Sequence, residues 1–364
     1  MSKKKYNPEV DLVKFFFSVI IMLFHTIKID VIAAGQHILP FGFTAVEFFF
    51  MVSGYLMAKS SLKYSTSETG KSTFDFVFRK IKSIYPYFFF SFIVAFFGRQ
   101  IILFNENSQT IVGFCKDALA SVSEALLIMK AGIDFGKSYN GPTWYIGAMI
   151  FAMAIIFPIL LKHRDWFLNI GSIVVAIFMY ALAFQEKHTL NYLDWSGWTT
   201  MAIIRAIGGI SLGCFVYALV ERIHKNNISL KKTGKVLLWL FEMALFALIL
   251  LIMQFEGKNK FDFITVIISL VLCFIIFSGL TGVQNILPSK LCSFLGKYSL
   301  LLYLNHRVVT RIINHYMPNL NYTQALLTFI ALTIIFSVVS DIVVTIYQKF
   351  SGKFMPKIKS LIFE

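Results

Sequence analysis

Residues 236–253 read VLLWLFEMALFALILLIM, an apolar stretch with a single charged side chain, Glu242. As a helix it would be about 27 Å long at a rise of 1.5 Å per residue, close to the roughly 30 Å of a bilayer core. A helix that is apolar on all sides suits lipid or a deep core, because a helix on the surface of a soluble protein needs a polar face. The stretch therefore predicts a membrane-spanning helix.

The remainder of the chain repeats this pattern. Of its 364 residues 57% are hydrophobic and 40 are phenylalanine, whereas a soluble domain is about 45–50% apolar. The composition predicts an all-α polytopic membrane protein with about ten transmembrane helices, forming one domain over residues 1–364 without a fused soluble domain. The expected helices are 11–33, 41–60, 82–104, 143–162, 167–184, 200–220, 235–254, 262–280, 291–313 and 324–347.

The segment 111–130 is apolar as well, but Lys116, Asp117 and Glu124 interrupt it. Charges at this spacing favour a re-entrant or interfacial helix. An eleventh spanning helix is the alternative.

The formal net charge is +15, and the basic residues concentrate in every second loop. Because cytoplasmic loops are enriched in Lys and Arg, we expect both tails, 1–10 and 348–364, in the cytoplasm and the chain in the cell membrane. Because the chain has so many apolar segments, we expect the positive charge to interact with membrane lipids and not with nucleic acid. The four cysteines show no metal-ligand spacing, and abundant Lys, Ile and Phe favour a bacterial source.

Ionisable residues inside spanning helices are costly, so they usually face a polar interior. Lys14 and His25 lie eleven residues apart, nearly three helical turns, and therefore share one face about 16 Å apart along the axis. Glu47 enters the next helix at a similar depth to His25. A carboxylate beside an imidazole orients a general base. The alternative is a buried pair that only fixes packing.

A basic cluster, Arg79, Lys80 and Lys82, precedes Pro86 at the start of the third expected helix. These side chains could bind the phosphates of a cytosolic donor. They could also anchor the helix beside anionic lipid.

Three further segments carry polar residues. Trp144 follows Gly141-Pro142 at a helix start, where an interfacial aromatic belt is a sufficient explanation. Arg205 needs an anionic partner, and the glycines that follow allow close helix packing; they are Gly208, Gly209 and Gly213. Tyr303 and His306 share a helix face with Ser299, as a polar seam or as part of a site.

In this order, these segments resemble the membrane-bound acyltransferase family 3. Lys14 and His25 are similar to its opening signature of a basic residue and a histidine eleven positions apart. Residues 46–56, VEFFFMVSGYL, are similar to the motif of its second helix. Three positions depart from the pattern, because the family usually has Arg where this chain has Lys14, Lys80 and Ser83.

The resemblance implies transfer of an acyl group, commonly acetyl, from cytoplasmic acyl-CoA to a hydroxyl of a carbohydrate. Acyl-CoA would be a donor substrate, with no permanently bound cofactor and no metal, and the acceptor a surface or lipid-linked glycan. His25, oriented by Glu47, would be the base. The residues expected to hold CoA are Lys14, Arg79, Lys80 and Lys82. Those expected to bind substrate are Trp144, Arg205, Tyr303 and His306.

Two other functions remain open at this point. A transporter or flippase of lipid-linked saccharides would also need intramembrane charges, but it would consume no thioester. In a membrane scaffold or sensor, His25 and Glu47 would matter only for folding. The sequence indicates no oligomeric state.

Overall fold

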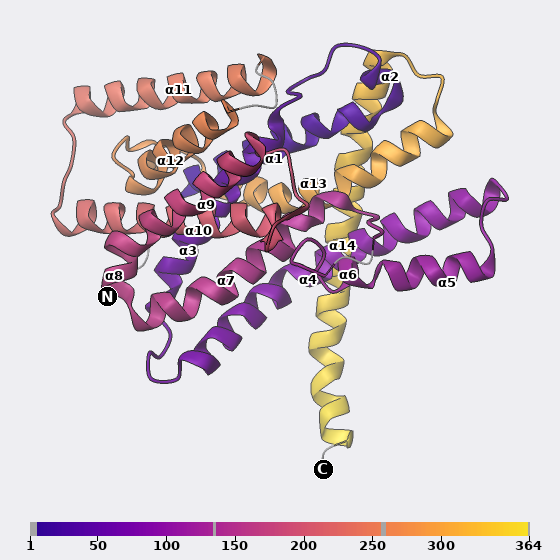
Figure 1. Ribbon diagram of the computed structural model, residues 1–364, viewed down its shortest axis with the longest axis horizontal. Coiled ribbons are helices and arrows are strands. Elements are labelled where there is room, and N and C mark those ends of the chain that lie inside the picture. Colours follow the sequence, from indigo (N-terminus) through magenta and orange to yellow (C-terminus); the bar gives the residue numbers. More distant parts are fainter. Residues whose placement is uncertain (1–5, 134–135, 256–259, 363–364) are drawn as a thin grey trace.

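The chain is almost entirely helical in the computed structural model (Figure 1). The structure describes residues 6–133, 136–255 and 260–362, the last eleven of these as backbone only. Residues 1–5 and 363–364 of the expected tails lie outside the described part. Helices lie at all ten expected places: α1 (Pro8–Phe24), α3 (Val46–Ser61), α4 (Thr69–Asn105), α7 (Trp144–Lys162), α9 (Ser172–Lys187), α10 (Met201–Lys225), α11 (Lys232–Phe255), α12 (Asp262–Ser278), α13 (Ser289–Tyr316) and α14 (Tyr322–Ile362).

Within the described ranges, seven helical segments are long and apolar enough to cross a membrane by length and composition. The prediction of an all-α polytopic membrane protein is therefore confirmed. These segments are Pro8–Lys28, Thr69–Asn105, Gly141–Lys162, Arg164–Lys187, Met201–Lys225, Lys232–Phe255 and Tyr322–Ser351.

The other three expected spans are helices with a weaker membrane signature. α3 has 16 residues and α12 has 17, fewer than the roughly 20 needed to cross a bilayer. α13 is 28 residues long, but lysines and arginines recur along it, among them Lys297 and Arg307.

The first expected helix, 11–33, is not continuous. α1 ends at Phe24, a 3-10 turn spans His25–Lys28, and α2 (Asp30–Ala33) follows. The Thr26 hydroxyl donates to the Leu23 carbonyl at 2.7 Å, and such local bonds compete with regular helix formation. His25 consequently lies at a helix end and not inside a helix.

The third helix begins thirteen residues earlier than expected and has 37 residues. At 1.5 Å per residue α4 is about 55 Å long, well beyond the bilayer core. The basic cluster 79–82 was expected where a loop meets the start of this helix. It is helical instead, and Pro86 also lies inside the helix.

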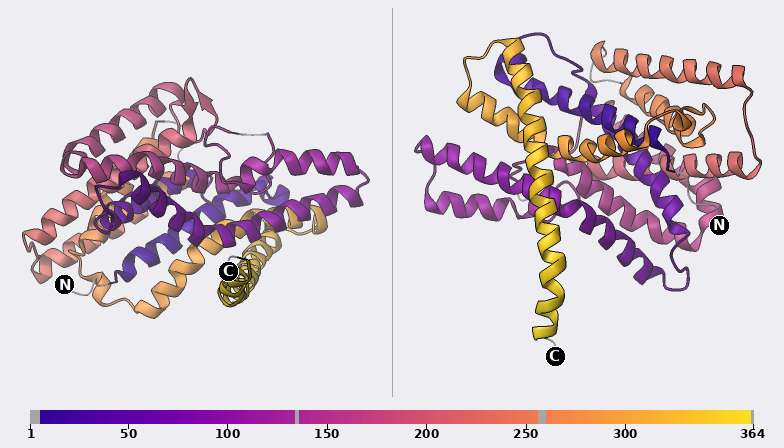
Figure 2. Two further views of the ribbon diagram at one scale, coloured as in Figure 1. Left: turned by 90° about the horizontal axis from the view of Figure 1, so that it is seen from below. Right: turned by 180° about the vertical axis from the view of Figure 1, so that it is seen from behind.

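The segment 111–130 forms two short helices, α5 (Ile111–Ala120) and α6 (Val122–Ala125), with α5 running back beside the end of α4 (Figure 2). α5 is about 15 Å long. It is too short to cross a membrane, which argues against the eleventh span, and the re-entrant or interfacial position of the segment stays a prediction.

The core is centred on α10, which packs against α3, α7, α9 and α12. Glycines allow the closest approach: a Cβ on Gly213 would lie 2.0 Å from the Met51 carbonyl oxygen, and one on Gly54 would lie 2.0 Å from the Ile210 carbonyl oxygen. Close packing through small residues, expected from the glycines after Arg205, is confirmed. α1 packs on α13, where the hydroxyls of Ser18 and Ser299 lie 2.6 Å apart.

The last helix differs most from expectation. α14 continues to Ile362 instead of ending near residue 347. It crosses the bundle steeply, and its C-terminal part projects beyond the other helices (Figures 1 and 2).

Candidate functional site

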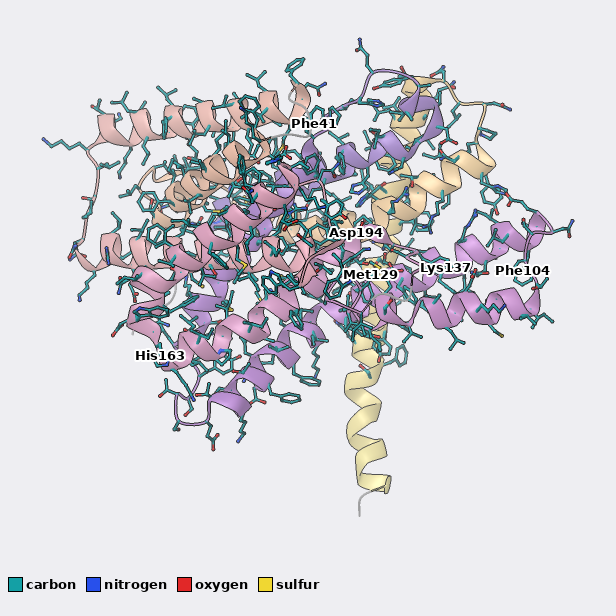
Figure 3. The ribbon with its side chains drawn as sticks, viewed as in Figure 1. Phe41, Phe104, Met129, Lys137, His163 and Asp194 are labelled. Atoms are coloured by element: carbon teal, nitrogen blue, oxygen red, sulfur yellow. The ribbon has the colours of Figure 1, made fainter. Side chains whose placement is uncertain are left out.

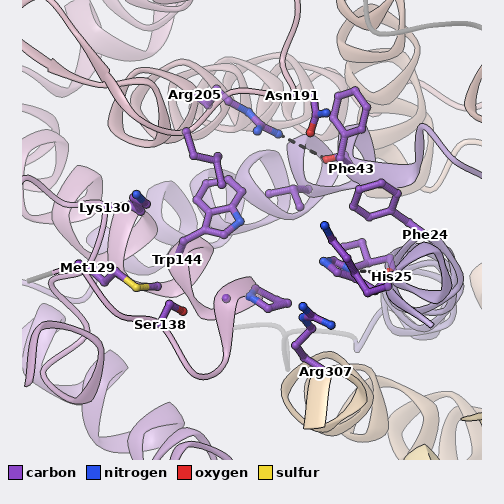
Figure 4. A pocket seen from close by; sticks show the side chains of 17 residues that line it. Phe24, His25, Phe43, Met129, Lys130, Ser138, Trp144, Asn191, Arg205 and Arg307 are labelled. Carbon is purple, nitrogen blue, oxygen red and sulfur yellow. Dashed lines mark hydrogen bonds between the residues drawn. The ribbon is translucent and has the colours of Figure 1, made fainter. Parts of the chain in front are cut away.

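A cavity of about 370 Å³ lies where α1 ends. Around it are His25 from the turn after α1, Trp144 from α7, Arg205 from α10 and Arg307 from α13 (Figure 4). The first three of these were sequence candidates. The fold therefore brings together residues that are up to 282 positions apart in the chain.

Two loops complete the wall of this cavity. The loop after α6 carries Met129 and Lys130, and the loop after α9 carries Asn191 and Leu193. Lys130 Nζ lies 2.6 Å from a carboxylate oxygen of Asp194, so an ion pair joins the two loops. Figure 3 marks these loops by Asp194 and by Met129, the residue before Lys130.

His25 is held by the end of its own helix. Its Nδ1 lies 2.8 Å from the Ile21 carbonyl oxygen. Because a carbonyl can only accept a hydrogen bond, Nδ1 carries the proton of the neutral ring and Nε2 is left with its lone pair. The imidazole on the cavity wall therefore offers one nitrogen that can take a proton.

The ring of His306 packs against the ring of His25. The two imidazole centroids are 4.7 Å apart. His306 is fully buried, its Nδ1 lies 3.1 Å from the Leu302 carbonyl oxygen, and its Nε2 has no hydrogen-bond partner among the described residues. His306 does not line the cavity and contacts the ring of His25 from within the protein.

The expected pairing of Glu47 with His25 is wrong. Arg205 Nε donates to one carboxylate oxygen of Glu47 at 2.6 Å, and the Tyr180 hydroxyl donates to the other. Glu47 begins α3 on the face that packs against α10. The sequence indicates how deep Glu47 lies along its helix, but it does not indicate toward which neighbouring helix the side chain points.

Arg205 is fixed from all sides. Besides Glu47 it donates to the Leu190 carbonyl at 2.7 Å, and its guanidinium carbon lies 5.1 Å from the centroid of Trp144. The anionic partner that the sequence required for Arg205 is thus Glu47. Trp144 lies on the cavity wall and makes a cation–π contact with Arg205, in addition to any role in an interfacial aromatic belt.

A second cavity, of about 280 Å³, continues from the first along α1. The two share Ile21 and Val46 in their walls. A third, of about 570 Å³, shares Lys14 and Leu56 with the second. The three cavities thus form a row from the start of α1 to His25.

Three cationic side chains and three tyrosines line the second cavity. Lys14, Lys80 and Lys297 line it, together with Tyr303. Lys14 is also paired with Asp11 at 2.7 Å, and the Tyr303 hydroxyl donates to the Pro142 carbonyl. Lys297 was missed, because it counted only as a basic residue near a helix start.

The basic cluster in α4 is divided between two faces. Lys80 faces the cavity, whereas Arg79 and Lys82 are exposed. The Arg79 guanidinium lies 5.1 Å from the ring centroid of Tyr64. The four residues expected to hold CoA are therefore divided. Lys14 and Lys80 line the same cavity, whereas Arg79 and Lys82 do not line it.

Glu124, which interrupts the segment 111–130, accepts hydrogen bonds from the loop before α7, a contact that the sequence did not predict. It is almost fully buried and accepts from the backbone amides of Tyr139 at 2.6 Å and Asn140 at 2.7 Å, and from the Thr143 hydroxyl at 3.2 Å and the Ser138 hydroxyl at 3.3 Å. Burial raises the pKa of its carboxyl, and these four donors oppose the rise.

Asn140 extends this network to α13. Its side-chain amide donates to the Ser91 hydroxyl at 2.7 Å and to the Leu304 carbonyl at 2.8 Å. The Gly141-Pro142 wall of the first cavity is thereby fixed relative to Tyr303 and His306. A sequence signal for this network was the carboxylate of Glu124 in the largely apolar segment 111–130.

The geometry agrees with a comparison to known families. A family model described as an acyltransferase domain matches residues 7–345, nearly the whole chain. The chain belongs to this acyltransferase family. It is thus a membrane-bound acyltransferase, as the resemblance implied. No curated protein and no solved structure matched the chain significantly.

Proposed function

We propose that this acyltransferase moves an acyl group, most simply acetyl, from acyl-CoA to a hydroxyl of a surface or lipid-linked carbohydrate. The observation that carries the proposal is the row of three cavities along α1. It joins a lysine-lined cavity to the cavity that holds His25.

The donor fits the lysine-lined part of this row. CoA carries several phosphate groups, and the ammonium groups of Lys14, Lys80 and Lys297 line this cavity, where they can make charge-assisted hydrogen bonds. Lys14 and Lys297 would do so in addition to their ion pairs with Asp11 and Asp341. Lys14 and His25 are about 16 Å apart along the helix, a distance that the extended pantetheine arm bridges. The thioester then reaches the shared wall at Ile21 and Val46.

The chemistry takes place at His25. Nε2 removes the proton of the acceptor hydroxyl as its oxygen bonds to the thioester carbonyl carbon. The carbon–sulfur bond of the tetrahedral intermediate then breaks, and the imidazolium returns the proton to the CoA thiolate. The guanidiniums of Arg205 and Arg307 on the same cavity wall stabilise the developing oxyanion.

The proposed orientation puts Lys14 at the cytoplasmic side and the His25 cavity toward the opposite side. The enrichment of cytoplasmic loops in basic residues supports it. Acyl-CoA would enter from the cytosol, and the acceptor would reach the loops around Lys130 and Asp194.

The test is acyl transfer in proteoliposomes with radiolabelled acetyl-CoA, scored by release of free CoA thiol and by the mass of the glycan. His25→Gln should lower the rate about 10²–10⁴-fold. His163→Gln, at an exposed histidine far from the cavity, is the matched control and should keep the rate. Normal transfer by His25→Gln would refute the mechanism, and glycan movement without thiol release would favour a transporter.

A further inference from the structure

A groove of about 340 Å³ lies apart from the three cavities, between α4, α13 and α14. Its lining is mostly apolar. Three of its residues, Phe97, Ile101 and Tyr316, expose about half of their surface: 46%, 54% and 53%. In a membrane protein such side chains face lipid, so the groove is open to a lipid chain.

Two guanidinium groups lie in this apolar groove, those of Arg99 and Arg311. Nη1 of Arg311 is buried without a hydrogen-bond partner. Arg99 makes no hydrogen bond or ion pair with any residue in the described ranges. Cations in such surroundings are costly unless an anion accompanies them.

The nearby carboxylates are already engaged. Glu124 interacts electrostatically with Arg311, but its oxygens accept from four other donors. Glu106, just after α4, lies 3.2 Å from Nδ1 of His315. Among the described residues, no carboxylate is therefore dedicated to Arg99 or Arg311.

A third arginine connects the groove with the His25 cavity. Arg307 precedes Arg311 by four residues, about one helical turn or 6 Å along α13. Arg307 lines the cavity that holds His25, and it interacts electrostatically with Arg311, as Arg99 does. The three cations thus form a row from the lipid-facing groove to the reacting centre.

We propose that Arg99 and Arg311 bind the phosphate of a lipid-linked acceptor. The lipid chain lies in the groove, the guanidiniums grip the phosphate oxygens through paired hydrogen bonds, and the sugar passes Arg307 to reach His25. This inference rests on the proposed function and specifies its acceptor as a saccharide carried on a lipid phosphate.

Binding is tested by native mass spectrometry of the full chain in detergent, with a polyprenyl phosphate, the corresponding uncharged polyprenol, and phosphatidylglycerol. The polyprenyl phosphate should bind at least about tenfold more tightly than the other two. Arg99→Gln and Arg311→Gln should each weaken it about tenfold, as expected for a charged hydrogen bond. Lys116→Gln, an exposed cation on the neighbouring α5, is the matched control.

A second measurement guards against misfolding. Arg311→Lys keeps the charge and should bind more tightly than Arg311→Gln, at equal thermal stability. In transfer assays the glutamine variants should raise KM for a lipid-linked acceptor and leave KM for acyl-CoA unchanged.

The outcomes separate this proposal from the one before it. Equal affinity for phosphatidylglycerol would overturn the acceptor site and leave a general lipid site. Unchanged binding in both glutamine variants would overturn it as well, while the transfer activity of the parent protein would stand. If the protein moved no acyl group at all, the proposed function would fail, and the binding measurement would still decide whether Arg99 and Arg311 hold a lipid phosphate.

Discussion

Replacing Glu47 by Gln should destabilise the protein strongly, because Glu47 is the counter-ion of Arg205. The pair is buried, with 2% and 0% of the two side chains exposed, and its oxygen and nitrogen lie 2.6 Å apart. Glutamine is nearly the same size, so the change removes charge with little change of volume. What remains is a guanidinium that cannot lose its proton.

The expected magnitude follows from the geometry. Removing one partner of a buried ion pair typically costs about 3–5 kcal/mol, because the other charge remains buried without compensation. That corresponds to about two to nearly four orders of magnitude in the unfolding equilibrium constant. Tyr180→Phe, which removes only the hydroxyl donor to the same carboxylate, should cost less, about 1.5–3 kcal/mol.

The assay is reversible unfolding of the purified protein in mixed micelles, with each variant measured at the same detergent composition. The double variant Glu47→Gln with Arg205→Gln should regain much of the loss, because no charge is left unpaired. If Glu47→Gln lost less than about 1 kcal/mol, or if the double variant were no more stable than the single one, Arg205 would not depend on Glu47 in this way.

Three other changes test separate parts of the structure. Gly213→Ala places a Cβ 2.0 Å from a carbonyl of α3 and should cost about 1–3 kcal/mol in unfolding assays, whereas Gly234→Ala, whose Cβ would meet nothing closer than 3.4 Å, should cost nothing. Glu124→Gln replaces one acceptor oxygen of the buried carboxylate by a donor amide; it should cost about 1–3 kcal/mol and lower kcat, and an unchanged melting temperature would contradict the network. Lys80→Gln should raise KM for acetyl-CoA several-fold in steady-state assays, and Arg79→Gln, on the exposed face, should raise it less; equal effects would argue against the lysine-lined cavity as the donor site.

The positions of the helices could be read from the sequence because most of the expected spans are long and apolar. The segment 236–253, for example, lies within α11. Helix ends were less accurate where polar residues continue a helix. α4 extends into its basic start and α14 continues to residue 362, since neither stretch needs lipid around it to stay helical.

The candidate site was predicted in part. His25, Trp144 and Arg205 do meet at one cavity, but the partner of Glu47 was wrong. Helical periodicity relates residues within one helix, and it contains no information on how two helices are rotated against each other. Lys297 was missed because it counted only as a basic residue near a helix start, although it lines the same cavity as Lys80.

The two aliphatic side chains shared by the first and second cavities, Ile21 and Val46, bear on substrate choice. Both are β-branched and therefore stiff about χ1, and both are buried. In the proposed reaction a thioester would pass these two side chains to meet the imidazole. Stiff aliphatic walls at that point would favour thin acyl chains over thick ones and would keep bulk water from the activated ester. Preference for a short acyl chain then needs no pocket shaped around that chain.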